Sequence, residues 1–147
     1  MSANALQPEK IHITDFKITK GHIESPFEFN NTNVEGHSYT VDLELGFKLD
    51  EKLIKADLTI SVTTKSIDNT NEDEASGEFC FAFIFYVDNI EELTTTENEL
   101  VNLNIALGNA ISSISYSTSR GILLTRFQGT ALSNFILPVI NPNDLLK

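Results

Sequence analysis

The sequence lacks the residues that most often build covalent or metal-bound frameworks. Its 147 residues include one cysteine, Cys80, one methionine and no tryptophan. A single thiol excludes an intrachain disulfide and a zinc site made of several thiolates. His12, His22 and His37 show no metal-ligand spacing, and the sequence contains neither a glycine-rich phosphate loop nor a nucleophile elbow. We therefore expect no metal, no cofactor and no catalytic residue.

Basic residues are also scarce. The chain has 10 lysines and arginines against 21 acidic residues, which gives a formal net charge of −11, and 20 of the acidic residues lie within residues 1–100. Such a field repels phosphate backbones and anionic lipid headgroups. The composition therefore argues against nucleic-acid binding and favours a basic protein partner.

No targeting segment is evident. The first residues contain neither a basic cluster nor a long apolar run, so a secretory signal is not expected. Together with the single cysteine, this favours a reducing compartment, and we expect a cytoplasmic location.

The length and the apolar content of 41% fit one domain spanning residues 1–147. Alternating apolar and polar residues predict four strands, at about 11–24, 39–49, 54–66 and 77–88. In the first, Ile11 and Ile13 fall on the face opposite to Phe16 and Ile18, and this change of phase predicts a bulge. An extended apolar segment is expected over residues 131–147, because residues before proline avoid the helical region.

A long helix is predicted over about residues 97–126. Thr96 and Glu99 have the spacing of a capping box, and leucines and isoleucines follow at helical intervals. No charged residue occurs from Leu100 to Ser119, yet about half of these residues are Asn, Ser, Thr or Gly, which argues against membrane insertion.

A helix without a charged face is normally buried on all sides. One small domain cannot easily surround it, so we expect a second subunit to cover it. The small residues beside Ile105 would permit close approach, and the predicted oligomer interface is Ile105, Gly108, Ser112 and Ser115.

Two groups of residues are candidates for binding. Aromatic and apolar residues outside the strands predict a contiguous apolar groove for polypeptide, although core packing is the alternative for each one: Phe27, Phe29, Phe127, Phe135 and Leu137. The second group is Asp42, Glu44 and Asp57, on the polar faces of two adjacent strands. These carboxylates are either simply solvated or a docking patch for a basic partner.

Two short motifs resemble the SecB protein-export chaperone family. One is the stretch ISYSTSRG at residues 114–121, late in the long helix, and the other is the ending LPVINPNDL at residues 137–145. The resemblance implies an α+β fold in which a four-stranded antiparallel, Greek-key-like sheet is followed by a long helix. It also implies a tetramer built as a dimer of dimers, with unfolded polypeptide clients in apolar grooves and the SecA motor docked on the acidic outer face of the sheet.

The functional expectation is an ATP-independent holdase that binds unfolded polypeptides and delivers preproteins to the SecA translocase. The chain ends at Lys147, where better-known members continue into a SecA-binding tail, so a toxin–antitoxin-associated chaperone stays open. A hot-dog-like acyl thioesterase using Glu97 or Glu99 near the helix start is an alternative. An oligomeric adaptor is another.

Overall fold

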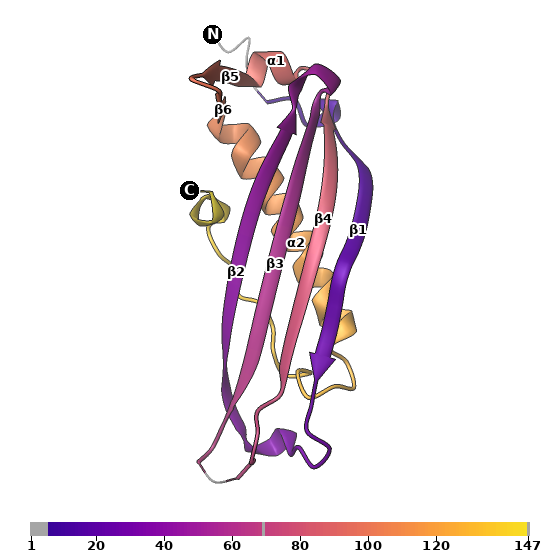
Figure 1. Ribbon diagram of the computed structural model, residues 1–147, viewed down its shortest axis with the longest axis vertical. Helices are drawn as coiled ribbons and strands as arrows, with labels where there is room; N and C mark the ends of the chain where they lie inside the picture. Colours follow the sequence, from indigo (N-terminus) through magenta and orange to yellow (C-terminus); the bar gives the residue numbers. More distant parts are fainter. Residues whose placement is uncertain (1–5, 69, 147) are drawn as a thin grey trace.

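The computed structural model describes residues 6–68 and 70–146. In chain order the strands and helices are β1 (Ile11–Glu24), β2 (Val34–Lys48), β3 (Leu53–Ser66), β4 (Ser76–Val87), α1 (Ile90–Leu93), β5 (Thr94–Glu97), β6 (Leu100–Leu103) and α2 (Ile105–Arg126). The molecule is elongated, and α2 lies along one face of four long strands (Figure 1).

The four long strands form one antiparallel sheet in the order β1-β4-β3-β2. Consecutive strands β2, β3 and β4 are neighbours, while β1 lies beside β4 at the opposite edge from β2. This is a Greek-key arrangement. The α+β class, with the antiparallel sheet preceding the long helix, is as predicted.

The edge strand β1 contains the predicted bulge. Its register with β4 shifts between Ile13 and Asp15, which leaves Thr14 without a partner. Ile13 therefore lies opposite Phe85, and Phe16 lies opposite Phe83. The extra residue brings the apolar side chains on both sides of it to the same face of the sheet.

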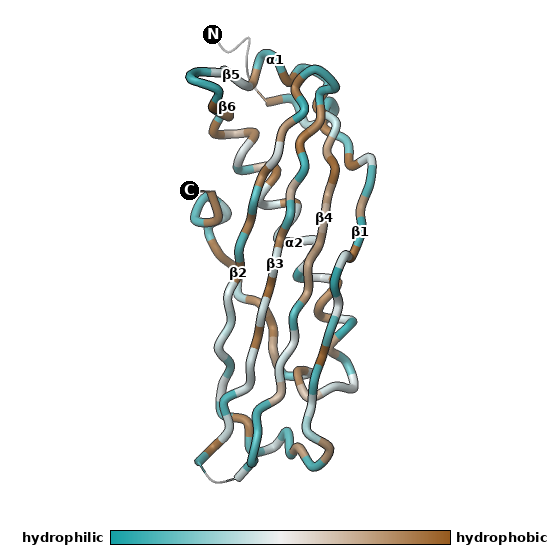
Figure 2. Tube along the Cα trace, in the orientation of Figure 1, coloured by the Kyte–Doolittle hydropathy of each residue, from teal (hydrophilic) through white to brown (hydrophobic). Residues whose placement is uncertain are grey.

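The core lies between the inner face of the sheet and α2. Alternate residues of β3 and β4 are buried there, and the largest are Phe81, Phe83, Phe85, Ile54, Leu58 and Ile60. Figure 2 shows the alternation of hydrophobic and hydrophilic residues along β2 and β3 that produces this two-sided sheet. Burial of each such side chain contributes about 1.5–3 kcal/mol.

The predicted start of the long helix is wrong. We predicted a helix from about residue 97, but residues 94–103 form the hairpin of β5 and β6, and α2 begins at Ile105. Three consecutive threonines favour a strand over a helix, because branching at Cβ restricts χ1 in a helix. Glu97 and Glu99 are consequently exposed hairpin residues and do not lie at a helix start.

The N-terminus of α2 has a different cap from the one predicted. The side-chain oxygen of Asn104 accepts hydrogen bonds from the backbone N–H groups of Ala106 at 2.9 Å and Leu107 at 3.2 Å. These bonds satisfy two of the N–H groups that a helix start leaves unpaired. The Asn104 N–H itself donates to the Leu93 carbonyl at 2.8 Å, which fixes α2 to the end of α1.

After α2 the chain turns and returns along the helix. Residues 131–134 form a turn, so the extended segment begins at about residue 135, later than predicted. The Tyr116 hydroxyl donates to the Pro138 carbonyl at 2.6 Å, and Arg120 Nε donates to the Leu137 carbonyl at 2.6 Å. The segment ends in the short 3-10 turn Pro142–Leu145, which lies beside both α2 and β2.

Candidate functional site

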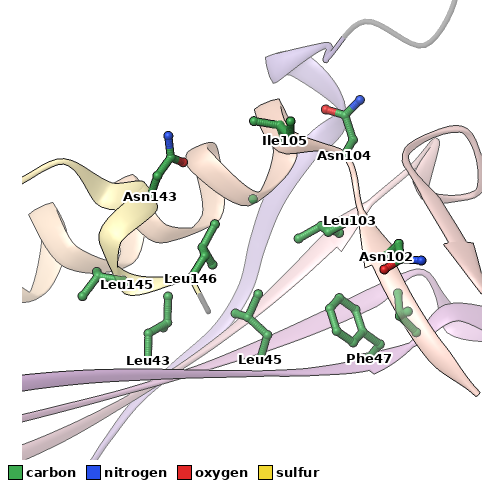
Figure 3. A pocket seen from close by; sticks show the side chains of 12 residues that line it. Leu43, Leu45, Phe47, Asn102, Leu103, Asn104, Ile105, Asn143, Leu145 and Leu146 are labelled. Atoms are coloured by element: carbon green, nitrogen blue, oxygen red, sulfur yellow. The ribbon is translucent and has the colours of Figure 1, made fainter.

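An open apolar groove lies between the edge strand β2 and the start of α2, and we call it the β2 groove (Figure 3). Its volume is about 560 Å³. It is lined by Leu43, Leu45, Phe47, Val101, Asn102, Leu103, Asn104, Ile105, Gly108, Asn143, Leu145 and Leu146.

Four segments of the chain build the groove. Leu43, Leu45 and Phe47 alternate along β2 and point toward the C-terminal turn and β6 in Figure 3. They are half-buried and contact the edge of the core. The opposite wall comes from Leu103, at the end of β6, and from Ile105, whose side chain is 81% exposed. The groove is thus an unfilled extension of the core toward solvent.

The groove combines apolar side chains with uncharged polar groups. Its only polar side chains are three asparagines, and none of the twelve lining residues carries a formal charge. Within the part of the chain that the structure describes, β2 pairs with β3 alone, so the backbone groups along the other side of β2 are not used within the sheet. An apolar surface next to an unpaired strand edge suits an extended polypeptide segment.

The structure does not bring the predicted aromatic residues into one exposed groove. Phe127, Phe135 and Leu137 are buried in the core of the chain, and Phe127 is only 2% exposed. The ring of Phe127 lies 5.8 Å from that of Phe79 in an edge-to-face arrangement. These three residues are accounted for by packing, because the returning C-terminal segment closes the core beside the end of α2.

The loop between β1 and β2, which contains Phe27 and Phe29, lies at the end of the molecule farthest from the β5–β6 hairpin (Figure 1). Phe27 is 103% exposed, whereas Phe29 is half-buried. Two hydrogen bonds between Asn30 and Asn71 hold this loop against the β3–β4 connection. Phe27 is therefore a separate exposed aromatic side chain and not a wall of the β2 groove.

The predicted acidic residues do gather on the outer face of the sheet. Glu44 lies directly opposite Asp57 in the β2–β3 register, and Asp42 is two residues along the same strand. Asp57 has a cation beside it, since its Oδ2 lies 3.6 Å from Lys55 Nζ. The arrangement is a flat patch with three carboxylates.

The small residues that we predicted at an oligomer interface are buried in the chain itself. Gly108, Ser112 and Ser115 have no appreciable exposure, and Leu146 would contact a side-chain Cβ at Gly108. The prediction was wrong for these three because the C-terminal segment and the sheet cover that side of α2. Ile105 is the exception, since it is exposed at the rim of the β2 groove.

The exposed side of α2 is a different set of residues. It consists mainly of small uncharged residues, among them Ala106, Ser117 and Gly121, together with the partly exposed Leu124. The helix is thus uncharged on both sides up to Arg120. The sequence contained this signal, but without the position of the C-terminal segment the two sides could not be told apart.

Sequence reasoning missed the β2 groove itself. The alternation in β2 identified Leu43, Leu45 and Phe47 as inward-facing, but it did not show that α2 leaves them partly uncovered. The wrong helix start contributed, because Leu103 was placed on a helix and not at the end of a strand. Among the described residues, no group of three or more metal-ligating side chains occurs, and no helix has the length and apolar character to cross a membrane.

The chain was compared with protein families, with curated proteins and with solved structures, and the comparison with solved structures gives a match. No protein-family model matches the sequence, and neither does any curated protein. Among solved structures, the chain is similar to the SecB-like chaperone Rv1957 of Mycobacterium tuberculosis, solved in complex with a ChAD peptide from the antitoxin HigA1 (Rv1956). The TM-score is 0.57 and the identity 15%, over 90% of this chain and 91% of that chain. The fold is therefore SecB-like.

Proposed function

We propose that this chain is an ATP-independent chaperone that holds apolar segments of unfolded polypeptide in the β2 groove. The observation that carries the proposal is the groove, an uncharged space of about 560 Å³ that is walled mainly by apolar side chains and lies beside the outer edge of β2. Apolar side chains of a client would enter between Leu45 and Ile105, and its backbone would lie along β2. The SecB-like fold supports the same function, since the similar solved structure is a chaperone bound to a peptide.

Phe27 and Phe29 provide a second contact in this proposal. Phe27 offers a fully exposed ring at the other end of the molecule, and a long unfolded client spans several sites on one chaperone. The working unit is a cytoplasmic homo-oligomer, a tetramer if it assembles as the family does. Clients are then passed to a partner that docks on Asp42, Glu44 and Asp57. SecA and the toxin–antitoxin setting are the two candidate contexts for that step.

The test is suppression of aggregation, followed by light scattering of a chemically denatured client diluted into buffer. Ile105→Asp places a charge in the groove at a side chain that is 81% exposed. It should leave the fold intact, because an acidic residue in the first turn of a helix is favourable. We expect suppression to weaken several-fold.

Ile67→Asp is the matched control, because Ile67 is an exposed isoleucine outside the groove. This variant should suppress aggregation like the wild type. Equal activity of Ile105→Asp and Ile67→Asp would place the client elsewhere. The holdase proposal would be rejected if the wild type neither suppressed aggregation nor co-eluted with a permanently unfolded client. An oligomeric adaptor would then be the alternative function.

A further inference from the structure

The outer face of the sheet contains a second apolar depression, on the side away from α2. We call it the outer hollow; its volume is about 340 Å³, and its walls include Gly46, Leu53, Lys55 and Ile84. The viewer of Figure 1 looks onto this face, with α2 behind the sheet. Leu53 and Ile84 are half-buried, although neither α2 nor the C-terminal segment covers them.

Gly46 creates the hollow. It lies opposite Lys55 in the β2–β3 register, and Lys55 in turn lies opposite Ile84 of β4. A Cβ at position 46 would have only the Lys55 Cβ near it, at 4.0 Å, so the space above the glycine is open. The backbone of Gly46 is not in a left-handed conformation. The backbone conformation of β2 therefore does not require glycine at this position. The effect of Gly46 is to leave room for a side chain of another protein.

The carboxylate patch adjoins the hollow along the strand. Glu44 comes two residues before Gly46 on the same face, which corresponds to about 7 Å. Glu44 also faces Asp57 across the strand pair, and like charges in this position are destabilising. Among the described residues, neither Glu44 nor Asp42 forms an ion pair.

The lysines at the hollow do not neutralise this charge. Lys48 lies 3.5 Å from Glu51, and Lys55 lies 3.6 Å from Asp57. Each of these cations therefore has its own carboxylate. Glu44 and Asp42 are left as the negative charges available to a partner next to the apolar space.

We propose that the outer hollow and Glu44 together dock an extended segment of a partner protein in which an apolar residue and a basic residue are two positions apart. The apolar side chain would enter above Gly46 and contact Leu53 and Ile84. The basic side chain would then lie over Glu44, because residues i and i+2 of an extended chain point to the same side with about 7 Å between them. This inference rests on the proposed function, in which a partner docks on this face of the sheet. It adds which two side chains the docking segment of that partner must contain.

The experiment is a selection of random dodecapeptides displayed on phage, against the full-length chain. Peptides retained by the Gly46→Ile protein are removed by counter-selection. Isoleucine fills the hollow and suits a strand, so the variant should fold. We expect the enriched peptides to share an apolar residue two positions from a lysine or arginine.

The best peptide is then labelled and measured by fluorescence anisotropy. Its affinity should fall by about tenfold or more for Gly46→Ile and for Glu44→Lys, as expected for a central anchor. Thr40→Ile and Glu35→Lys, which introduce the same two residues farther along β2, should alter it less than about twofold. No enriched binder, enriched binders without this spacing, or unchanged affinity for Glu44→Lys would each overturn the proposal.

The two proposals can fail separately. Ile105 lies in α2, on the opposite side of the sheet from the outer hollow. The Ile105→Asp protein should therefore bind the selected peptide with unchanged affinity, while its suppression of aggregation is weakened. Peptide binding by a wild-type protein that suppresses no aggregation would reject the holdase function alone. Suppression by a protein that selects no such peptide would reject the docking motif alone.

Discussion

Glu99 has a backbone conformation that is unfavourable for a residue with a long side chain. Its φ is 68°, and that of its neighbour Asn98 is 53°. These two residues form the turn between β5 and β6. Asparagine tolerates the left-handed region, whereas other side chains pay a cost there. The Glu99 side chain is exposed, so burial does not offset this cost.

Glu99→Gly should therefore stabilise the protein. Glycine adopts positive φ without a steric penalty, and the gain should be roughly 0.5–1 kcal/mol after the extra entropy of an unfolded glycine is subtracted. The free energy of unfolding in urea measures it. Asn98→Gly is the control and should change stability less. A loss of stability in Glu99→Gly would mean that residues 97–103 are helical in solution.

His37 gives the protein a pH dependence. Its ring packs 5.1 Å from that of Phe135, its Nε2 atom is buried without a hydrogen-bond partner, and burial lowers the pKa of the imidazole below the usual 6.5. The unfolded chain therefore binds this proton more readily than the folded one. The stabilisation is complete above about pH 6.5 and is lost as the pH falls below it toward the folded pKa.

We expect the wild type to lose more free energy of unfolding than His37→Gln between about pH 7.5 and pH 5. Glutamine removes the titrating group, and the other two histidines, His12 and His22, are present in both proteins. Urea unfolding at several pH values measures the difference. Parallel pH profiles of the two proteins would show that the imidazole stays accessible to water.

Residue type alone did not determine which aromatic side chains are exposed. Phe27 and Phe127 both lie outside the strands, and both were expected to line the apolar groove for polypeptide. Phe127 is buried because the C-terminal segment folds back beside it, whereas no element covers Phe27. Such burial depends on contacts between distant segments, so periodicity carries no information about it.

At the scale of elements, β1 shows how a local pattern predicts a local irregularity. The phase change between Ile13 and Phe16 correctly indicated a bulge, because both residues lie on the same face of the sheet. The capping-box pattern at Thr96, in contrast, wrongly predicted the start of the long helix. A two-residue signature competes with the strand preference of three threonines and with the better cap at Asn104. Patterns with many participating residues were the reliable ones.

Deletion of Thr14 should be tolerated. Without this residue Ile11, Ile13, Phe16 and Ile18 alternate regularly on one face, and the ladder with β4 needs no bulge there. Thr14 contributes one hydrogen bond of 3.3 Å to the Ile84 carbonyl, and it is exposed. We expect a melting temperature within a few degrees of the wild type, measured by circular dichroism.

Deletion of Lys17 provides the contrast. Phe16 and Ile18 then become adjacent, and one of them must leave the core in any register. Removing a fully buried large apolar side chain costs roughly 2–5 kcal/mol. Because Phe16 and Ile18 are half-buried, this variant should lose part of that amount and unfold more easily than the Thr14 deletion. Similar destabilisation by both deletions would mean that the bulge itself is needed for folding.

For the whole molecule, the sequence supplied the strands but not their order. Alternation of apolar and polar residues identifies the inward side chains of each strand. The alternation in β2, however, is compatible with a central position in the sheet as well as with an edge position. Its place at the edge leaves Leu43, Leu45 and Phe47 half-buried and thereby creates the β2 groove. The family resemblance implied a Greek-key-like sheet, whereas the order of its strands and the groove could be recognised only from the assembled chain.

The exposed face of α2 is the remaining feature that one chain leaves uncovered. It carries no charge before Arg120, and a charge-free helix face is usually buried. Gly121 lies on it with open space around its Cα. Gly121→Arg should therefore separate subunits that pack helix against helix, without unfolding the chain, because arginine is a better helix former than glycine.

We expect light scattering on a sizing column to give a smaller mass for Gly121→Arg than for the wild type at the same concentration, with unchanged helical circular dichroism. Gln128→Arg adds the same charge at an exposed position beyond the helix and should keep the wild-type mass. If Gly121→Arg also keeps an oligomeric wild-type mass, the subunits must meet elsewhere, with the free strand edges as the next candidates. If the wild type is a monomer, the uncharged face is left for polypeptide, and Gly121→Arg should then weaken suppression of aggregation.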